Sequence, residues 1–310
     1  MPSCCNPHSP PSPSVQDFWL QQGALPGLLE LPAIAGHEGA GVILALGSDV
    51  KDKSLKVGDA VLLSFTACGA CSDCRDNQSS RCPNFGVFNL KGSVRPDGTS
   101  PAKLLDGRPV MSQWFGQSSF SRISAVDQKC VVKCPSLDDL AIYSPMGCGY
   151  QTGAGTVLNV LKPEPHQTVA VFGAGSVGFA ALMAAAALSV KQLIAVDIVE
   201  PKLALARELG ATHTINTTAI EGDVIDKIKE LTGGRGVDFA IDATGVPSVT
   251  EKMLDCVAFC GTAASVGVPP PTSKITVGLG AFVSGRKTWV SVTEGDSHPP
   301  EVCSTLFNSL

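Results

Sequence analysis

The stretch VAVFGAGSVG at residues 169–178 decides the fold of the second half of this 310-residue chain. Residues 169–172 are apolar and contain β-branched side chains, which predicts a buried strand. The glycines that follow have the spacing G-x-G-x-x-G, and an alanine-rich run then predicts a helix. The run LIAVD at residues 193–197 predicts a second strand. A strand, a glycine turn, a helix and a second strand form the βαβ unit that binds a dinucleotide.

Each glycine of the motif has its own physical task. Gly173 permits the tight turn, Gly175 leaves room for a pyrophosphate, and Gly178 lets the helix pack closely on the sheet. Val177 belongs to the first turn of the predicted helix, where free N–H groups and the helix dipole favour phosphate groups. We therefore predict that these four residues bind the phosphates of a cofactor.

The acid that closes the second strand, Asp197, indicates which cofactor binds. Its carboxylate can accept hydrogen bonds from the adenosine ribose hydroxyls and would repel a 2′-phosphate, which favours NAD over NADP. The alternative is a glycine-rich loop without a ligand, followed by an aspartate that caps a helix. The complete βαβ context favours the cofactor over this alternative.

From about residue 150 onward, strand and helix patterns alternate, which predicts an α/β domain with a doubly wound parallel sheet. A proline at the start of one predicted helix and a glycine at its end fit the usual asymmetry of helix termini. The predicted strands are residues 169–172, 193–196, 239–241 and 262–266, and the predicted helices are 176–188, 201–209, 225–231 and 249–259.

The first half of the chain has a different pattern. Short apolar runs at residues 41–46 and 60–65 and an alternating run at 119–125 are separated by turns, which predicts an all-β, barrel-like unit. Residues 1–14 hold five prolines and four serines, so we expect a low-complexity tail that does not pack. The length of the chain is consistent with two domains.

Four cysteines lie close together within the β-rich half. Cys68, Cys71, Cys74 and Cys82 have the spacing C-x2-C-x2-C-x7-C, so four thiolates can surround one Zn²⁺ ion and close a structural site. An iron–sulfur cluster is less consistent with the spacing, because the ferredoxin pattern has three residues before its last cysteine. Four thiols without a metal are the remaining alternative, and they would be prone to oxidation in a polar loop.

Composition excludes several function classes. The net charge of −5, the low aromatic content of 5% and the lack of a basic block argue against a nucleic-acid partner. The first residues have no secretory pattern, so we expect a cytoplasmic protein whose cysteines bind metal. Residues 167–190 carry no charge and could span a bilayer, but they divide into a strand, a turn and a buried helix, so we expect no membrane partner.

A set of motifs occurs in one order along residues 17–300. The runs are GHEGAG at 36–41, the four-cysteine loop, GCG at 147–149, the glycine motif with its aspartate, and SVGVPP at 265–270. In these motifs the chain resembles the zinc-dependent medium-chain alcohol dehydrogenase family. The runs WFGQSSF at 114–120 and TEGDS at 293–297 are similar to its aryl- or benzyl-alcohol branch.

The resemblance implies roles for individual residues. His37 and Cys148 match ligands of a catalytic zinc, and Glu38 matches the acid beside that metal. The four cysteines of the loop match the structural-zinc ligands. Thr152 and Val268 match residues that contact the nicotinamide end of NAD, and Lys202 matches a basic residue near the adenosine ribose.

The implied architecture is a GroES-like β-barrel domain plus a Rossmann domain. We expect an unmatched tail at residues 1–16, a zinc-binding catalytic domain at 17–149, an NAD-binding domain at 150–294 and a remnant of the catalytic domain at 295–310. The implied reaction is hydride transfer between a primary, aromatic alcohol and NAD, with zinc as the Lewis acid. By analogy with the family, the chain would form a homodimer or homotetramer.

The chain departs from the family at both ends. The family supplies a third zinc ligand from a cysteine within a C-H-T-D-like run, where this chain reads Ser14-Val15-Gln16-Asp17 and only Asp17 agrees. Cys4, Cys5 and His8 have the wrong spacing to replace that ligand. We therefore expect an incomplete catalytic zinc site, and we expect the termini to come from a faulty gene model or a degenerate gene.

Two other functions stay open. A non-catalytic protein could keep the NAD fold and the structural zinc without turnover, and zinc stoichiometry with an assay on benzyl alcohol would distinguish it. A zinc-free quinone or enoyl reductase is the second alternative, but Asp197 and the four-cysteine loop argue against it. Cys256 and Cys260, four residues apart on a predicted helix, are expected to be buried structural thiols.

Overall fold

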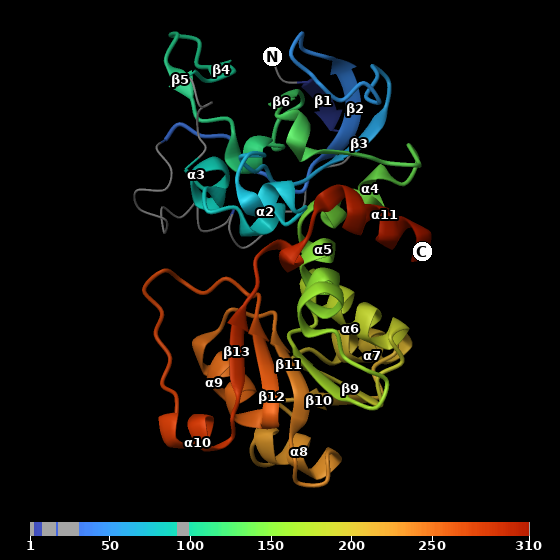
Figure 1. The fold of residues 1–310 in the computed structure, drawn as a ribbon, viewed down its shortest axis with the longest axis vertical. Helices are drawn as coiled ribbons and strands as arrows, with labels where there is room; N and C mark the ends of the chain where they lie inside the picture. The colour runs from blue at the N-terminus through green and yellow to red at the C-terminus, as the bar shows by residue number, and fades with distance from the viewer. Residues whose placement is uncertain (1–2, 8–16, 18–30, 92–98, 310) are drawn as a thin grey trace. The chain divides into compact units, whose positions relative to one another are not determined.

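The computed structural model describes residues 3–7, 17, 31–91 and 99–309. The chain divides into two compact units (Figure 1). One unit comprises Met1–Gly149 together with Ser297–Leu310, and the other comprises Tyr150–Asp296. In the described part of the chain, no helix is both long enough and apolar enough to pass through a bilayer.

The first unit is built on a five-stranded sheet with the order β6-β1-β2-β3-β7. Its strands pair antiparallel to their neighbours, as expected for short strands joined by turns. The strands are β1 (Ser3–Pro7), β2 (Ala40–Ala45), β3 (Ala60–Leu63), β6 (Ser124–Val126) and β7 (Val131–Lys133), with a separate hairpin of β4 (Ala102–Lys103) and β5 (Pro109–Val110). The helices are α2 (Ser72–Arg75), α3 (Phe85–Asn89), α4 (Leu140–Tyr143) and α11 (Pro299–Ser309).

Strand β1 corrects the prediction that the N-terminal tail does not pack. It lies between β2 and β6, with Cys5 opposite Ile43 on one side and Ser124 on the other. Pairing with two strands supplies partners for the backbone groups of β1, so a segment without a hydrophobic pattern can still join the sheet. The remaining tail residues, including His8 and the Ser14–Gln16 run, lie outside the described residues.

The last segment of the chain belongs to this first unit. Helix α11 packs its Cys303 side chain into the interior, with no exposed surface, and its Phe307 ring lies 5.1 Å from the ring of Tyr143. Ahead of the helix, His298 Nδ1 lies 3.3 Å from the Ser79 hydroxyl. Contacts at both ends of the segment therefore attach it to the β-rich unit.

The second unit contains a six-stranded parallel sheet with the order β10-β9-β8-β11-β12-β13. Its strands are β8 (Thr168–Phe172), β9 (Gln192–Asp197), β10 (His213–Asn216), β11 (Val237–Asp242), β12 (Val257–Ser265) and β13 (Thr288–Ser291). Its helices are α5 (Gly149–Gly155), which continues as a π-helix over Thr156–Leu161, then α6 (Ser176–Ala187), α7 (Glu200–Glu208), α8 (Val224–Leu231), α9 (Pro247–Cys256) and α10 (Leu279–Ser284).

Helices cover both faces of this sheet, with α6 and α7 on one side and α9 on the other (Figure 1). Alternate strand residues such as Ala170 and Phe172 point to one face, where they pack against Ile228 of α8 and Met253 of α9. The predicted doubly wound α/β sheet is confirmed. Strands β10 and β13 were not predicted, because their short sequences have little hydrophobic alternation.

The predicted helix over residues 249–259 is too long. Helix α9 ends at Cys256, and β12 begins at Val257. Cys256 is buried as expected, whereas Cys260 is exposed and has a φ of 60°. The expectation of a buried thiol is therefore wrong for Cys260, because the strand that contains it, unlike a continued helix, places it at the surface.

Candidate functional site

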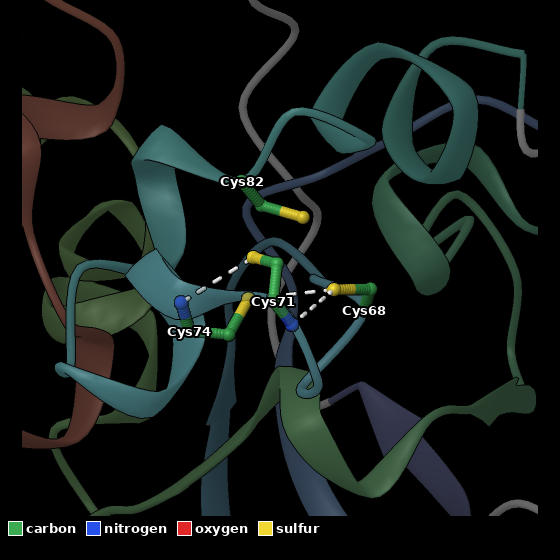
Figure 2. Close-up of side chains that lie close together, drawn as sticks. All are labelled: Cys68, Cys71, Cys74 and Cys82. Atoms are coloured by element: carbon green, nitrogen blue, oxygen red, sulfur yellow. Dashed lines mark hydrogen bonds between the residues drawn. The ribbon is translucent and has the colours of Figure 1, made fainter.

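The four cysteines of the predicted zinc loop converge in the first unit (Figure 2). Their sulfur atoms all lie within 4.8 Å of one another, and Sγ of Cys68 is 3.8 Å from Sγ of Cys74. A tetrahedral site with Zn–S distances of about 2.3 Å has S–S separations of about 3.8 Å. One separation already has this value and the others exceed it by at most about 1 Å, so small side-chain shifts would let the four thiols surround one zinc ion.

Backbone N–H groups of the loop donate hydrogen bonds to two of the sulfur atoms. The N–H groups of Ala70 and Cys71 point at Sγ of Cys68, at 3.4 and 3.3 Å, and the N–H of Cys74 points at Sγ of Cys71 at 3.5 Å. The two hydrogen bonds to Cys68 lower the pKa of its thiol to about 6. Gly69 has a φ of +71°, which permits the tight turn that brings these amides inward.

Two contacts, one of them buried, hold the loop in place. Asn89 of α3 is fully buried. Its side-chain oxygen accepts the N–H of Thr66, and its side-chain nitrogen donates to the Thr66 carbonyl, two residues before the first cysteine. Nζ of Lys129 donates to the carbonyl of Ala67 at 2.6 Å. Asn89 could not be recognised from the sequence, because a single asparagine at the end of a short helix has no distinctive spacing signal.

A second set of predicted residues surrounds His37 in the same unit. The His37 side chain is buried, and its ring stacks on Phe115 at a centroid distance of 4.3 Å. Nδ1 of His37 lies 3.3 Å from Oδ2 of Asp17, while Oδ1 of Asp17 accepts the N–H of Gly36 at 2.9 Å. A carboxylate beside Nδ1 favours the proton on that nitrogen, which leaves the Nε2 lone pair as the metal-binding atom.

Glu38 connects the His37 segment to Cys148. Its Oε1 accepts the N–H of Gly149, the residue after Cys148, at 3.0 Å. Burial raises the pKa of the Glu38 carboxyl, while the neighbouring His37 and the Gly149 amide oppose this rise. An imidazole, a thiol and a carboxylate, all of which zinc accepts as ligands, are therefore tethered to one another through the backbone.

Backbone packing requires small residues around this set. A Cβ atom at Gly147 would lie 2.0 Å from the carbonyl oxygen of Leu63, and the hydroxyl of Ser64 donates to the Gly147 carbonyl at 2.6 Å. Gln117 bridges the same region, because its amide nitrogen donates to the carbonyls of His37 and Ser64. The GCG run at 147–149 is thus held directly against β3.

The structure does not bring His37, Glu38 and Cys148 into a preformed cluster. Among the described residues, the four-cysteine set is the single group of three or more possible ligands whose atoms lie within 4.8 Å of one another. Ser14, which stands where the family has its third cysteine ligand, lies outside the described residues. The donor types for a catalytic zinc are present, but the compact geometry of the structural site is not.

The glycine motif lines part of a cavity of about 710 Å³ in the second unit. The site lies at the carboxyl ends of β8, β9, β10 and β11, where open α/β sheets bind their ligands. Gly173, Gly175, Asp197 and Lys202 all line it, whereas Thr152, Val177, Gly178 and Val268 do not. The first four residues therefore share one space, as an NAD site requires.

Gly178 has the packing role that the sequence predicted, whereas the role of Gly175 in binding a cofactor stays a prediction. A Cβ atom at Gly178 would lie 1.8 Å from the carbonyl oxygen of Gly173, so the helix can approach the turn only with a glycine there. Gly175 faces open space instead, which leaves room for a pyrophosphate. Asp197 accepts the N–H of Ala174 at 2.6 Å, so the acid also fixes the glycine turn.

The other two predicted cofactor residues lie elsewhere in the second unit. Thr152 is buried in α5, and its carbonyl accepts the hydroxyl of Thr156. Val268 follows β12 and is 39% exposed, and its backbone lies so close to Gly245 that a Cβ there would come within 2.6 Å of the Val268 oxygen. Both residues keep their assignment to the nicotinamide end as a prediction.

Comparisons with known proteins agree with both halves of the molecule. Residues 14–136 match the model of an alcohol dehydrogenase GroES-like domain, and residues 176–308 match that of a zinc-binding dehydrogenase. A geraniol dehydrogenase from Castellaniella defragrans is 39% identical over 271 residues, which cover 87% of this chain and 71% of that protein.

Solved structures agree as well. An alcohol dehydrogenase zinc-binding domain protein from Burkholderia ambifaria is 37% identical, with a TM-score of 0.87 over 99% of this chain and 80% of its own. The benzyl alcohol dehydrogenase of Acinetobacter calcoaceticus is 32% identical, with a TM-score of 0.88 over 99% of this chain and 82% of its own. The chain therefore belongs to the family of zinc- and NAD-dependent medium-chain alcohol dehydrogenases.

Proposed function

We propose that this chain transfers a hydride between a primary aromatic alcohol and NAD. The similarity to a benzyl alcohol dehydrogenase supports the aromatic class, and the similarity to a geraniol dehydrogenase supports the wider class of primary alcohols next to a double bond. Both molecules are primary alcohols whose carbinol carbon is bonded to an sp² carbon, so the double bond or ring stabilises the developing aldehyde. The WFGQSSF and TEGDS runs add support from the sequence itself.

We assign the residues of the reaction centre from the contacts around His37. His37 and Cys148 would hold the catalytic zinc, with Glu38 as the carboxylate beside it. Asp17 would orient the imidazole through Nδ1 so that Nε2 faces the metal. When bound, the zinc ion supplies Lewis acidity toward an alcohol oxygen. The buried surroundings of His37 and Glu38 would exclude competing water from these groups.

The NAD half of the site follows from the glycine motif. The turn at Gly173 and Gly175 would hold the pyrophosphate, with Val177 and Gly178 in the helical turn behind it. Asp197 and Lys202 would bind the adenosine ribose, and Thr152 and Val268 the nicotinamide end. The remaining lone pairs of the Asp197 carboxylate can accept ribose hydroxyls, because each carboxylate oxygen accepts more than one hydrogen bond.

The domain roles, assembly and location are part of the same proposal. Residues 17–149 would form the catalytic domain, residues 150–294 the NAD-binding domain and residues 295–310 a returning part of the catalytic domain. The four-cysteine loop favours a reducing compartment, which is consistent with the cytoplasm. A homodimer or homotetramer is expected by family analogy, and light scattering on the purified protein tests it.

The experiment measures zinc content and turnover in one preparation. Two zinc ions per chain together with NADH formation from benzyl alcohol and NAD⁺ would support the enzyme and show that the catalytic zinc site is completed in the protein. The variant Cys148→Ser should retain one zinc and lose turnover, while the exposed Cys260→Ser should retain two zinc ions and full turnover. Two zinc ions without NADH formation from benzyl alcohol or geraniol would contradict the proposed substrate class.

One observation favours a second candidate function. The four cysteines lie close together and one cavity is lined by Gly173, Gly175, Asp197 and Lys202. By contrast, His37, Glu38 and Cys148 do not form a compact ligand group. This combination fits a protein that binds NAD and one zinc ion without turnover. One zinc ion per chain, tight NADH binding and no activity on either alcohol would support this candidate over the enzyme.

A further inference from the structure

The NAD cavity extends beyond the groups that the glycine motif accounts for. The pyrophosphate and ribose use Gly173, Gly175 and Asp197, but the cavity continues between the loop after β10 and helix α9. This inference rests on the proposed place of the adenosine ribose at Asp197. The base of that nucleoside must lie in the adjoining part of the same space, because it is bonded directly to the ribose.

Apolar side chains form the walls of this extension. Ile198, Val199 and Val246 line the cavity and are 63%, 38% and 46% exposed. Exposed apolar side chains that gather at a cavity indicate a ligand with an apolar surface. A flat purine ring would cover them, and Ile198 directly follows the aspartate that we assign to the ribose.

An ion pair lies in the wall of the same cavity. Nζ of Lys252, on α9, contacts Oδ2 of Asp223, which stands immediately before α8. The other oxygen of Asp223 accepts the N–H of Ile225 at 2.9 Å, which fixes the carboxylate at the start of the helix. Both side chains remain partly exposed, 43% for Lys252 and 35% for Asp223, so each keeps surface for a ligand.

The donor and acceptor pattern of this pair matches one edge of adenine. A carboxylate can only accept hydrogen bonds and an ammonium group can only donate them. Adenine presents a donor at its exocyclic amine and an acceptor at N1, side by side. Hypoxanthine presents an acceptor at O6 and a donor at N1. The carboxylate of the pair would then face another acceptor, and the ammonium group would face another donor.

We propose that Asp223 and Lys252 together recognise the adenine of NAD, with the carboxylate accepting from the exocyclic amine and the ammonium group donating to N1. The pair then has a role beyond joining α8 to α9. A purely structural ion pair would affect stability when it is broken, but it would not change which base the cavity prefers.

The test compares two cofactors by equilibrium binding. Fluorescence titrations measure the Kd of NADH and of reduced nicotinamide hypoxanthine dinucleotide for the full chain. The wild type should prefer NADH by about tenfold or more, the value expected for one well-placed hydrogen bond to a charged group. Lys252→Met keeps the aliphatic stem, and it should weaken NADH binding by about tenfold and reduce the preference for NADH, while Asp223 still disfavours O6 of hypoxanthine.

The matched control is Lys227→Met, which breaks the exposed pair of Lys227 with Glu230 on α8, outside the cavity. It should leave both affinities unchanged. Asp223→Asn keeps an acceptor for the Ile225 amide and gains a donor, so it should increase affinity for the hypoxanthine cofactor. This gain gives a result even if Lys252→Met does not fold.

The outcomes separate this inference from the proposed function. If Asp197→Ala loses NADH but Lys252→Met retains the wild-type preference for adenine, the adenine contact is refuted while the ribose assignment stands. A wild type without preference between the two cofactors also overturns it. If the wild-type chain does not bind NADH, the proposed function fails, and this inference fails with it.

Discussion

Gly175 and Gly178 belong to one motif, but substitution by alanine should affect them in opposite ways. Gly178→Ala places a Cβ 1.8 Å from a carbonyl oxygen, so we expect it to lower the free energy of unfolding by about 2 kcal/mol or more. Gly175 has a φ of −91° and open space around it, so Gly175→Ala should fold normally. Its new methyl group would instead obstruct the pyrophosphate.

Two measurements check this pair of substitutions. Thermal denaturation without cofactor should show a reduced Tm for Gly178→Ala and a Tm close to wild type for Gly175→Ala. NADH titration of Gly175→Ala should show a loss of affinity of about tenfold or more, equivalent to about 1.4 kcal/mol. Equal losses of Tm in both variants would contradict the separation of packing from ligand binding.

Asp17 should act as a positioning residue for His37. Asp17→Asn keeps an acceptor for the Gly36 amide but removes the negative charge beside Nδ1. Loss of such a partner weakens metal affinity by about 10–100-fold. We therefore expect zinc titration to show a weakened second site, with the four-cysteine site unaffected.

The exposed variant Asp106→Asn, which alters a pair with Arg108 at the surface, is the control and should retain both zinc sites. Unchanged affinity of the second zinc in Asp17→Asn would show that Asp17 only braces the backbone at Gly36. Asp17 agreed with the family pattern in the sequence, but its role became apparent only from its distance to His37.

The element that depends most on metal is the lobe from Cys68 to Asn89, which contains α2, a 3-10 turn at Ser79–Arg81 and α3. These elements are too short to be stable by themselves. Cys71→Ser should remove one zinc ion and increase hydrogen exchange across the lobe, with a stability loss of about 2 kcal/mol or more. The buried Cys134→Ser, outside the cluster, should keep the zinc content of the wild type.

The effect should extend from the lobe to the end of the chain. Asn77 donates to Glu301 at 2.8 Å, and the Ser79 hydroxyl contacts His298, so the segment before and at the start of α11 is attached to the lobe. We expect faster hydrogen exchange in residues 298–303 of Cys71→Ser as well. Exchange that stays at the wild-type rate in that segment would show that these contacts do not stabilise it.

Secondary structure was predictable where the hydrophobic pattern is strong. Strand β8 and helix α6 appear within one residue of their predicted bounds, because an apolar run, a glycine turn and an alanine-rich run have few alternatives. The boundary between α9 and β12 was missed, because no glycine or proline separates Cys256 from Val257. There, pairing of β12 with β11 overrides the local preference.

Among the described residues, the two units have separate clusters of buried apolar side chains. One cluster in the second unit includes Ile194 and Met253, one in the first unit includes Ile43 and Val61, and a further one in the first unit includes Trp114. We expect calorimetry to show that NADH stabilises the transition of the second unit, by about 2.7 kcal/mol at a concentration one hundred times its Kd. Zinc chelation should lower only the transition of the first unit.

A single transition that shifts equally with NADH and with chelator would contradict this expectation, since it would mean that the two units unfold together. The chain offers its own controls for the assignment. Gly175→Ala should reduce the stabilisation by NADH to about 1.4 kcal/mol or less at the same NADH concentration. Cys71→Ser should remove the chelator effect, and neither variant should alter the other response.

The sequence by itself determined the α/β Rossmann domain, the grouping of the four cysteines in one loop and the glycine turn between β8 and α6. Each depends on residues close together in the chain, so the spacing of these residues is enough to predict how they lie in the structure. The tertiary structure decided what depends on distant residues: the place of Ser3–Pro7 between β2 and β6, the contact of Asp17 with His37, and the pairing of Asp223 with Lys252. No local pattern encodes such contacts, because only the folded chain brings their partners within reach.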